Sequence, residues 1–216
     1  SHYEGLFAQK RSLTSTIRMA LVGKENTAKT GNAIDIARRH IGPDKQIIIF
    51  DVDNSAVATV AANYGDDPNI SVIPLFDETD DTIFNDDNTT NWTALVDKMG
   101  YFINIVGEKC RDGEVGAVIM DGCSTFLKWC EHAMTNVLLT RSKNPVNVED
   151  GDKFNQAEWR VRNRLFRDVM NRAHQLPVDA VFFTFHLKDV KQFGEIGNGQ
   201  KGLMKVGEVP EWEKGT

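Results

Sequence analysis

Long apolar runs, metal-ligand cysteine patterns and an excess of basic residues are all missing from this sequence, and each absence argues against a class of protein. No run approaches the roughly 18 apolar residues that a membrane span needs, so we expect no membrane partner. The three cysteines lack metal-ligand spacing and the five histidines form no cluster, which argues against a zinc site. A net charge of −6 argues against a uniformly basic nucleic-acid-binding protein.

The remaining composition is that of one soluble domain. We predict that Cys110, Cys123 and Cys130 are buried free thiols of a reducing compartment. No signal-peptide pattern opens the chain, so we expect a cytoplasmic protein. A length of 216 residues without an internal repeat or linker predicts a single domain over 1–216. The chain opens Ser-His without Met and stops without an obvious terminal element, so we expect the natural protein to extend further.

Apolar segments alternate with segments of helical periodicity along the whole chain. The apolar segments predict strands over 18–22, 46–50, 70–76, 115–120 and 179–185. Apolar residues at helical spacing predict helices over 30–41, 56–64, 91–110, 124–140 and 156–176. Residues 142–154 are predicted to be a loop, and the glycine-rich chain from Lys188 onward is predicted to be irregular. The alternation predicts an α/β fold, with a mostly parallel central sheet and helices on both faces.

The first strand leads into a glycine loop, and the first helix follows that loop. A phosphate-binding loop needs small residues around the phosphates, a lysine that reaches their oxygens and a hydroxyl that holds Mg²⁺. Lys29 and Thr30 stand in the last two places, while Ala28 replaces the usual second glycine and is tolerable only at negative φ. The alternative is a chance strand, turn and helix with a surface lysine. The predicted nucleotide-binding residues are Gly23, Lys24, Glu25, Asn26, Thr27, Ala28, Lys29, Thr30 and Gly31.

Acidic residues and one histidine follow the other predicted strands. In parallel sheets, ligands bind beyond the carboxyl ends of the strands, so these residues are expected near the glycine loop. Asp121 suits the water shell of Mg²⁺, or it caps the helix that begins at Ser124. Asp51 and Asp53 either supply a carboxylate that polarises an attacking water or cap the next helix. His186 either touches the terminal phosphate or is a solvated or structurally hydrogen-bonded residue.

The predicted helix over 156–176 carries a row of arginines. Arg160, Arg164 and Arg167 lie at i, i+4 and i+7 and therefore share one face. One interpretation is a solvated face paired with Glu158 and Asp168. The other is contact with DNA or with the phosphates of a neighbouring subunit.

The order of these motifs resembles the RecA-type P-loop ATPase core. The segments GKENTAKT, IIIFDVD, AVIMD and VFFTFHLK carry the likeness, which runs roughly from Ile17 to Gly207. It is strongest to the small RecA-fold ATPases of bacteriophages associated with single-strand annealing and recombination. The resemblance implies Mg²⁺-dependent ATP hydrolysis, with the phosphates held by Lys29, the metal by Thr30 and Asp121, Asp53 in place of the catalytic glutamate, and His186 in place of the sensor glutamine.

The resemblance also implies partners. Residues 142–155 and 190–207 match the two DNA-binding loops of the family, and a homo-oligomer in the host cytoplasm is implied for a phage protein. The lysines expected to contact single-stranded DNA are Lys143, Lys191, Lys201 and Lys205. The chain departs from the commonest family pattern at Ala28, Asp53 and His186.

Two other functions remain open at this stage. One is a regulatory nucleotide-binding ATPase that binds a protein partner and no DNA, which the acidic composition favours. The other is a P-loop kinase of a small molecule or nucleotide, although the sequence carries no clear arginine-bearing lid.

Overall fold

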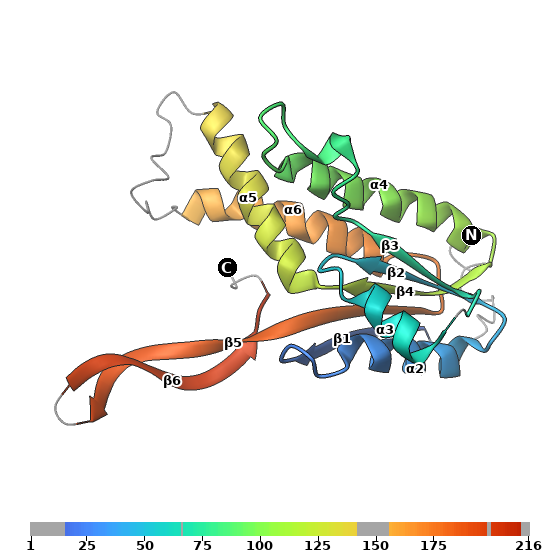
Figure 1. Cartoon of the computed structure of the whole chain (residues 1–216), viewed down its shortest axis with the longest axis horizontal. Helices are drawn as coiled ribbons and strands as arrows, with labels where there is room; N and C mark the ends of the chain where they lie inside the picture. Colours follow the sequence, from blue (N-terminus) through green and yellow to red (C-terminus); the bar gives the residue numbers. More distant parts are fainter. Residues whose placement is uncertain (1–15, 66, 142–155, 198–199, 213–216) are drawn as a thin grey trace, which may run out of the picture.

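A sheet of six strands forms the centre of the molecule (Figure 1). The computed structural model describes residues 16–65, 67–141, 156–197 and 200–212. Five strands run parallel in the order β1-β5-β4-β2-β3, and a sixth pairs only with an extension of β5. Their bounds are β1 (Ile17–Gly23), β2 (Gln46–Asp51), β3 (Ile70–Pro74), β4 (Val115–Asp121), β5 (Ala180–Gly197) and β6 (Gln200–Pro210).

Helices cover both faces of the sheet (Figure 1). Helices α2 (Lys29–Ile41) and α3 (Ala56–Asn63) bury apolar side chains on one face. The other face carries α4 (Trp92–Arg111), α5 (Cys123–Arg141) and α6 (Gln156–His174), and a short 3-10 turn, η1 (Asp81–Ile83), precedes α4. The predicted α/β fold with a mostly parallel sheet and helices on both faces is therefore confirmed.

Strand β2 illustrates why the apolar runs of the sequence form central strands. Ile47 and Ile49 pack toward α2 and α3, whereas Ile48 and Phe50 pack toward α4, α5 and α6. All four side chains are buried, because successive residues of a strand point to opposite faces and helices cover both. Cys110, Cys123 and Cys130 are free and buried in the second of these layers, as predicted.

Strand register brings the predicted site residues to one edge. Gly23 of β1 lies beside His186 of β5, and Asp51 of β2 lies beside Asp121 of β4. Because the strands are parallel, their carboxyl ends meet where the loop after β1 enters α2. The polar residues that follow four different strands therefore share one edge of the sheet.

The chain after Lys188 is regular, which corrects the prediction of an irregular loop there. Strand β5 continues to Gly197 and pairs with antiparallel β6, so that the two form a ribbon that projects from the body (Figure 1). Lys191 pairs with Lys205 and Phe193 with Leu203 across the ribbon. The pairing of β5 with β6 contains two register shifts. The ribbon is open to solvent, so it tolerates glycine residues that would weaken a central strand.

Within the part of the chain that the structure describes, no helix combines the length and the apolar character that crossing a membrane requires. The predicted loop over 142–154 lies outside the described residues, as does Lys143.

Candidate functional site

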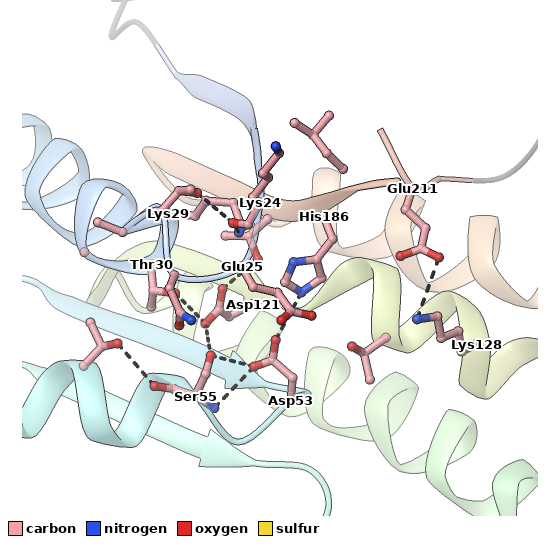
Figure 2. Close-up of a pocket in the computed structure, with 18 residues that line it drawn as sticks. Lys24, Glu25, Lys29, Thr30, Asp53, Ser55, Asp121, Lys128, His186 and Glu211 are labelled. Atoms are coloured by element: carbon pink, nitrogen blue, oxygen red, sulfur yellow. Dashed lines mark hydrogen bonds and ion pairs between the residues drawn. The ribbon is translucent and has the colours of Figure 1, made fainter. Parts of the chain in front are cut away.

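A cleft of about 670 Å³ opens at the carboxyl edge of the sheet, beside the loop between β1 and α2 (Figure 2). The loop 24–31 forms one wall, and Asp53, Asp121, Thr184 and His186 come from the ends of the neighbouring strands. Thr125 and Lys128 of α5, together with Glu211, line the opposite side. The nucleotide-binding residues predicted from the sequence, except Gly23 behind them, therefore line one cavity.

The glycine loop is tightly folded. A Cβ added at Gly23 would lie 2.5 Å from the Oγ1 of Thr27, so only glycine fits there without rearrangement. That hydroxyl donates to the carbonyl of Lys24 at 2.8 Å and closes the turn. Asn26 and Ala28 have φ values of 58° and 55°, the left-handed region that favours glycine. The negative φ on which tolerance of Ala28 depends is therefore absent, and the methyl group sits in a strained position worth about 1 kcal/mol.

Helix α2 begins immediately after this turn and leaves its first N–H groups facing the cleft. Ala28 occupies the N-cap and offers no side-chain hydrogen bond, and the first turn contains no acidic residue. Helix N-termini carry partial positive charge and free N–H donors, which attract anions. The start of α2 therefore provides the elements of a phosphate-binding site.

Lys29 lies against its own loop. Its Nζ donates to the carbonyl oxygens of Gly23 at 3.3 Å and Lys24 at 2.6 Å. Burial lowers the pKa of Lys29, while the negative charges of Asp121 and Asp53 act in the opposite direction. The ammonium group thus stays within the loop, at the entrance to the cleft.

Asp121 joins the loop to the end of β4. Its carboxylate accepts a hydrogen bond from the Thr30 hydroxyl at 2.8 Å and another from the Thr184 hydroxyl at 2.6 Å. Burial raises the pKa of Asp121, and these two hydrogen bonds oppose that rise. The alternative in which Asp121 caps the helix near Ser124 finds no support in these contacts. Ser124 instead accepts from the His186 N–H at 2.9 Å and donates to the carbonyl of Glu211 at 2.9 Å.

Asp51, in contrast, is a helix cap. Its carboxylate accepts hydrogen bonds from the N–H groups of Ser55 at 3.1 Å, Ala56 at 3.0 Å and Val57 at 3.4 Å. Burial raises the pKa of Asp51 to about 6, with the charges of Asp121 and Asp53 adding to the rise. The capping interpretation is therefore correct for Asp51, and Ser55 at the N-cap position makes no capping hydrogen bond with its own side chain.

Asp53 faces the cleft and meets His186. Its carboxylate accepts from the Ser55 hydroxyl at 2.6 Å, and its other oxygen lies 3.6 Å from the His186 Nε2 (Figure 2). Gly122, with φ 88°, packs against this carboxylate, since an added Cβ would lie 3.1 Å from the Asp53 Cγ. The Nδ1 of His186 is buried and has no hydrogen-bond partner among the described residues. The structure thus pairs two residues that the sequence pointed to separately.

Three carboxylates gather at this edge of the sheet. Asp51, Asp53 and Asp121 each offer an oxygen within 4.8 Å of the others. Asp51 is committed to the start of α3, so Asp53, Asp121 and the hydroxyl of Thr30 are the groups that line the cleft. Clustered carboxylate and hydroxyl oxygens are the ligands that Mg²⁺ prefers, and they fit such an ion here.

Lys191, Lys201 and Lys205, which were predicted to contact DNA, are not among the described residues that line the cleft. Lys191 and Lys205 lie on the ribbon, and Lys205 contacts Asp189 at 2.6 Å and also Glu208. The side chain of Lys201 lies outside the described residues. One further lysine is tied to the ribbon, since the Lys24 Nζ lies 2.8 Å from the Glu208 Oε1. Among the described ribbon lysines, the charge of Lys205 is therefore balanced by carboxylates.

Sequence reasoning assigned no role in the site to Ser55, Thr184, Lys128 and Glu211, all of which line the cleft. Thr184 was detectable, because it is a polar residue inside the apolar strand segment VFFTF and lies two residues before His186. Glu211 was not, since its position depends on the N–H that it donates to the carbonyl of His186 at 2.7 Å.

No protein-family model matches the chain, and a search of curated proteins found no match either.

Proposed function

We propose that the protein binds a nucleoside triphosphate, ATP, with Mg²⁺ in this cleft and hydrolyses it. The observation that carries the proposal is the hydrogen bond between Thr30 and Asp121, 91 residues apart in the sequence. It joins the hydroxyl that follows the loop lysine to a buried carboxylate at the end of a central strand. P-loop enzymes place magnesium between such a hydroxyl and such a carboxylate.

The loop and the start of α2 bind the phosphates in this proposal. The N–H groups of the first turn donate to phosphate oxygens, and Lys29 exchanges its loop carbonyls for oxygens of the terminal phosphates. Thr30 and Asp121 hold the metal and its water shell. Mg²⁺ held there would neutralise negative charge on the phosphates and so favour attack at the terminal phosphorus.

Asp53 and His186 orient the attacking water. A carboxylate facing the cleft accepts a hydrogen bond from water and aims its oxygen at the terminal phosphorus. The new P–O bond forms as the bond to the bridging oxygen breaks, ADP leaves with the electrons of that bond, the proton of the attacking water passes to solvent, and the products are ADP and phosphate. The side chain of Asp53 is one methylene shorter than the glutamate at the corresponding position of RecA-type cores. The imidazole of His186, which lies beside Asp53, extends the polar surface toward the substrate.

The test is ATP binding and phosphate release by the Lys29→Ala variant. Charge-assisted hydrogen bonds contribute roughly 1.5–3 kcal/mol, so affinity for ATP should fall by at least about tenfold while the fold is retained. Lys109→Ala, which removes an exposed lysine from α4, serves as the matched control. Tight ATP binding by a folded Lys29→Ala protein would rule out the loop as a phosphate site.

We further propose that this activity serves single-stranded DNA in recombination or annealing, in a homo-oligomer of the chain. The support is the motif order shared with RecA-type cores and a ribbon that extends β5 directly from His186 in the cleft. Phosphate release with and without a single-stranded oligonucleotide tests the proposal. Stimulation by DNA supports it, and equal rates contradict it.

A regulatory ATPase with a protein partner is the second candidate. The pairing of Lys205 with Asp189 and Glu208 favours it, because carboxylates beside the ribbon lysines weaken attraction to phosphate. The structure gives less support to the kinase alternative, because no arginine is among the described residues that line the cleft. Phosphate release that requires a small acceptor molecule would select the kinase.

A further inference from the structure

Two adjoining hollows lie on the outer surface of α6, away from the nucleotide cleft. The first, of about 310 Å³, is lined by Arg160, Asn163, Arg164, Arg167, Asp168 and Asn171. The second, of about 420 Å³, is lined largely by apolar side chains of α6, β5 and the chain after β6, including Phe183, Phe185 and Trp212. Arg167 and Asn171 line both, so the two hollows form one continuous surface.

One half of this surface is positively charged. Arg160, Arg164 and Arg167 are exposed, and their spacing places them about 6 Å and 4.5 Å apart along the helix axis. Among the described residues that line the hollows, Asp168 is the one carboxylate, and its Oδ2 lies 3.1 Å from Arg172 on the next turn. That pairing engages Asp168 with an arginine outside the row. Three arginines and one carboxylate thus line the first hollow, so its lining has a positive net charge.

The other half is aromatic. Trp212 is 47% exposed, and its ring meets that of Phe185 edge to face at a centroid distance of 5.9 Å. The preceding residue, Glu211, holds this segment in place by donating its N–H to the carbonyl of His186 at 2.7 Å. Trp212 is thus a large, partly exposed ring on a fixed support.

The aromatic half continues onto β1, the edge strand of the sheet. Val22 lies beside Phe185 and Ala20 beside Phe183, and both β1 side chains are exposed. Among the described residues, no helix buries Ala20 and Val22. An open apolar strip therefore runs from Trp212 along the β1 edge.

We propose that single-stranded nucleic acid binds across this surface, with its phosphates on the arginine row and a base stacked on Trp212. The inference rests on the DNA part of the proposed function and moves its main contact from the ribbon lysines to α6. A cationic track beside an aromatic ring is the chemistry that recognises unpaired nucleotides, since every base has a face that can stack. A duplex hides those faces and fits only the charged half. A protein partner would need acidic and apolar groups in the same order, and the test below separates it.

The experiment measures binding of a fluorescent oligo(dT) to the full chain over a range of salt concentrations. The Arg160→Gln, Arg164→Gln double variant should bind at least about tenfold more weakly at low salt. Its plot of log affinity against log salt should be less steep by about 1.4, since each phosphate contact on a single strand contributes about 0.7. Arg39→Gln, Arg111→Gln is the charge-matched control, because both arginines are exposed on α2 and α4. This control should bind like the unaltered protein.

Trp212→Leu tests the stacking contact while keeping an apolar side chain against Phe185. Loss of one stacked base corresponds to roughly 5-fold to 150-fold weaker binding of oligo(dT). Binding of a duplex of equal length should change much less. Unaltered ATP binding and a native circular dichroism spectrum verify that each variant is folded.

Two outcomes overturn the inference in distinguishable ways. If the α6 and Trp212 variants bind oligo(dT) like the unaltered protein while Lys191→Gln, Lys205→Gln loses binding, the ribbon is the site and the DNA function stands. If the unaltered protein binds no oligo(dT) at low salt, with or without a non-hydrolysable ATP analogue, the DNA function and this inference fail together. In that case ATP binding by the loop remains separately tested by Lys29→Ala.

Discussion

Single residues decide the chemistry of the cleft, and several of them depart from what a phosphate loop usually contains. Ala28 has a left-handed backbone where glycine is unstrained, and Asp53 contacts a histidine rather than standing alone. Both departures lie within one cavity, beside the Thr30–Asp121 hydrogen bond. Replacements at Ala28 and Asp121 therefore test the strained loop and the proposed metal site separately.

Replacing Ala28 by glycine should stabilise the protein. The left-handed conformation costs an L-residue with a Cβ about 1–2 kcal/mol, and the greater freedom of glycine in the unfolded chain offsets part of the gain. We expect the free energy of unfolding to rise by about 0.5–1 kcal/mol, measured by urea denaturation. Ala58→Gly, at an exposed position of α3, is the matched control and should lower stability by about 0.5–1 kcal/mol. A fall for both variants would mean that the loop relaxes the strain in solution.

Replacing Asp121 by asparagine should remove magnesium-dependent hydrolysis more than nucleotide binding. The carboxylate is proposed to act through the metal, whereas the loop N–H groups and Lys29 contact the phosphates directly. We expect phosphate release to fall about 100-fold or more and ATP affinity to fall less than about tenfold. Asp112→Asn, on an exposed carboxylate after α4, should change neither. Normal turnover by a folded Asp121→Asn protein would show that the residue is only structural.

At the scale of elements, strand ends and helix starts share their polar groups. Asp51 ends β2 and caps α3, and Asp121 ends β4 and contacts the first turn of α2. The cap is buried, so its charge destabilises the fold unless the hydrogen bonds from α3 compensate. The stability of the β2–α3 connection therefore depends on pH.

The sign of this dependence follows from the pKa of Asp51, which burial raises to about 6 from an unfolded value near 3.9. The folded protein binds this proton more tightly than the unfolded chain does. Asp51 therefore contributes most to the free energy of unfolding at low pH, and its contribution falls as the pH rises from about 4 to 6. Asp51→Asn removes that fall. Between pH 4.5 and pH 7.5, the free energy of unfolding of the variant should therefore rise by about 1–2 kcal/mol relative to that of the unaltered protein.

Urea denaturation at both pH values, with magnesium chelated, measures the effect. Asp112→Asn should follow the unaltered protein at both pH values. Parallel pH dependence of the unaltered and Asp51→Asn proteins would mean that Asp51 titrates normally.

The elements could be predicted where apolar pattern alone decides them. Segments such as 46–50 are apolar on both faces and form central strands, and the five predicted helices all occur. The pattern could not distinguish Asp51 from Asp53, because which carboxylate turns toward α3 depends on the path of the chain after β2. It also could not show that Asp53 and His186 meet, since that requires β5 to lie between β1 and β4.

At the scale of the whole molecule, the body, which consists of the five parallel strands and the helices on both faces, contains the apolar core, whereas the ribbon of β5 and β6 lies outside it. The body buries two apolar layers, one on each face of the sheet. The ribbon pairs with itself beyond the sheet, and its side chains Phe193 and Leu203 are about two-thirds exposed, at 65% and 66%. The sequence did not predict the ribbon, because it is rich in glycine and because apolar and polar residues alternate only weakly in a strand that buries neither face. The ribbon thus adds reach to the molecule and little to its core.

Removing most of the ribbon should therefore leave the core intact. Replacing 191–206 by Asn-Gly should leave a two-residue turn between Val190 and Gly207, which are paired in β5 and β6, and Asn-Gly is the favoured sequence for such a turn. The variant keeps the Lys24–Glu208 ion pair and Trp212, so ATP affinity should stay within about twofold and the melting temperature within about 4 °C. If the α6 surface holds the single strand, oligo(dT) binding should also persist although Lys191, Lys201 and Lys205 are gone. Thermal unfolding, ATP titration and oligo(dT) titration of one preparation measure all three, with ATP binding as the internal control for folding. Loss of ATP binding would show that the ribbon supports the cleft, and loss of oligo(dT) binding alone would place the single strand on the ribbon.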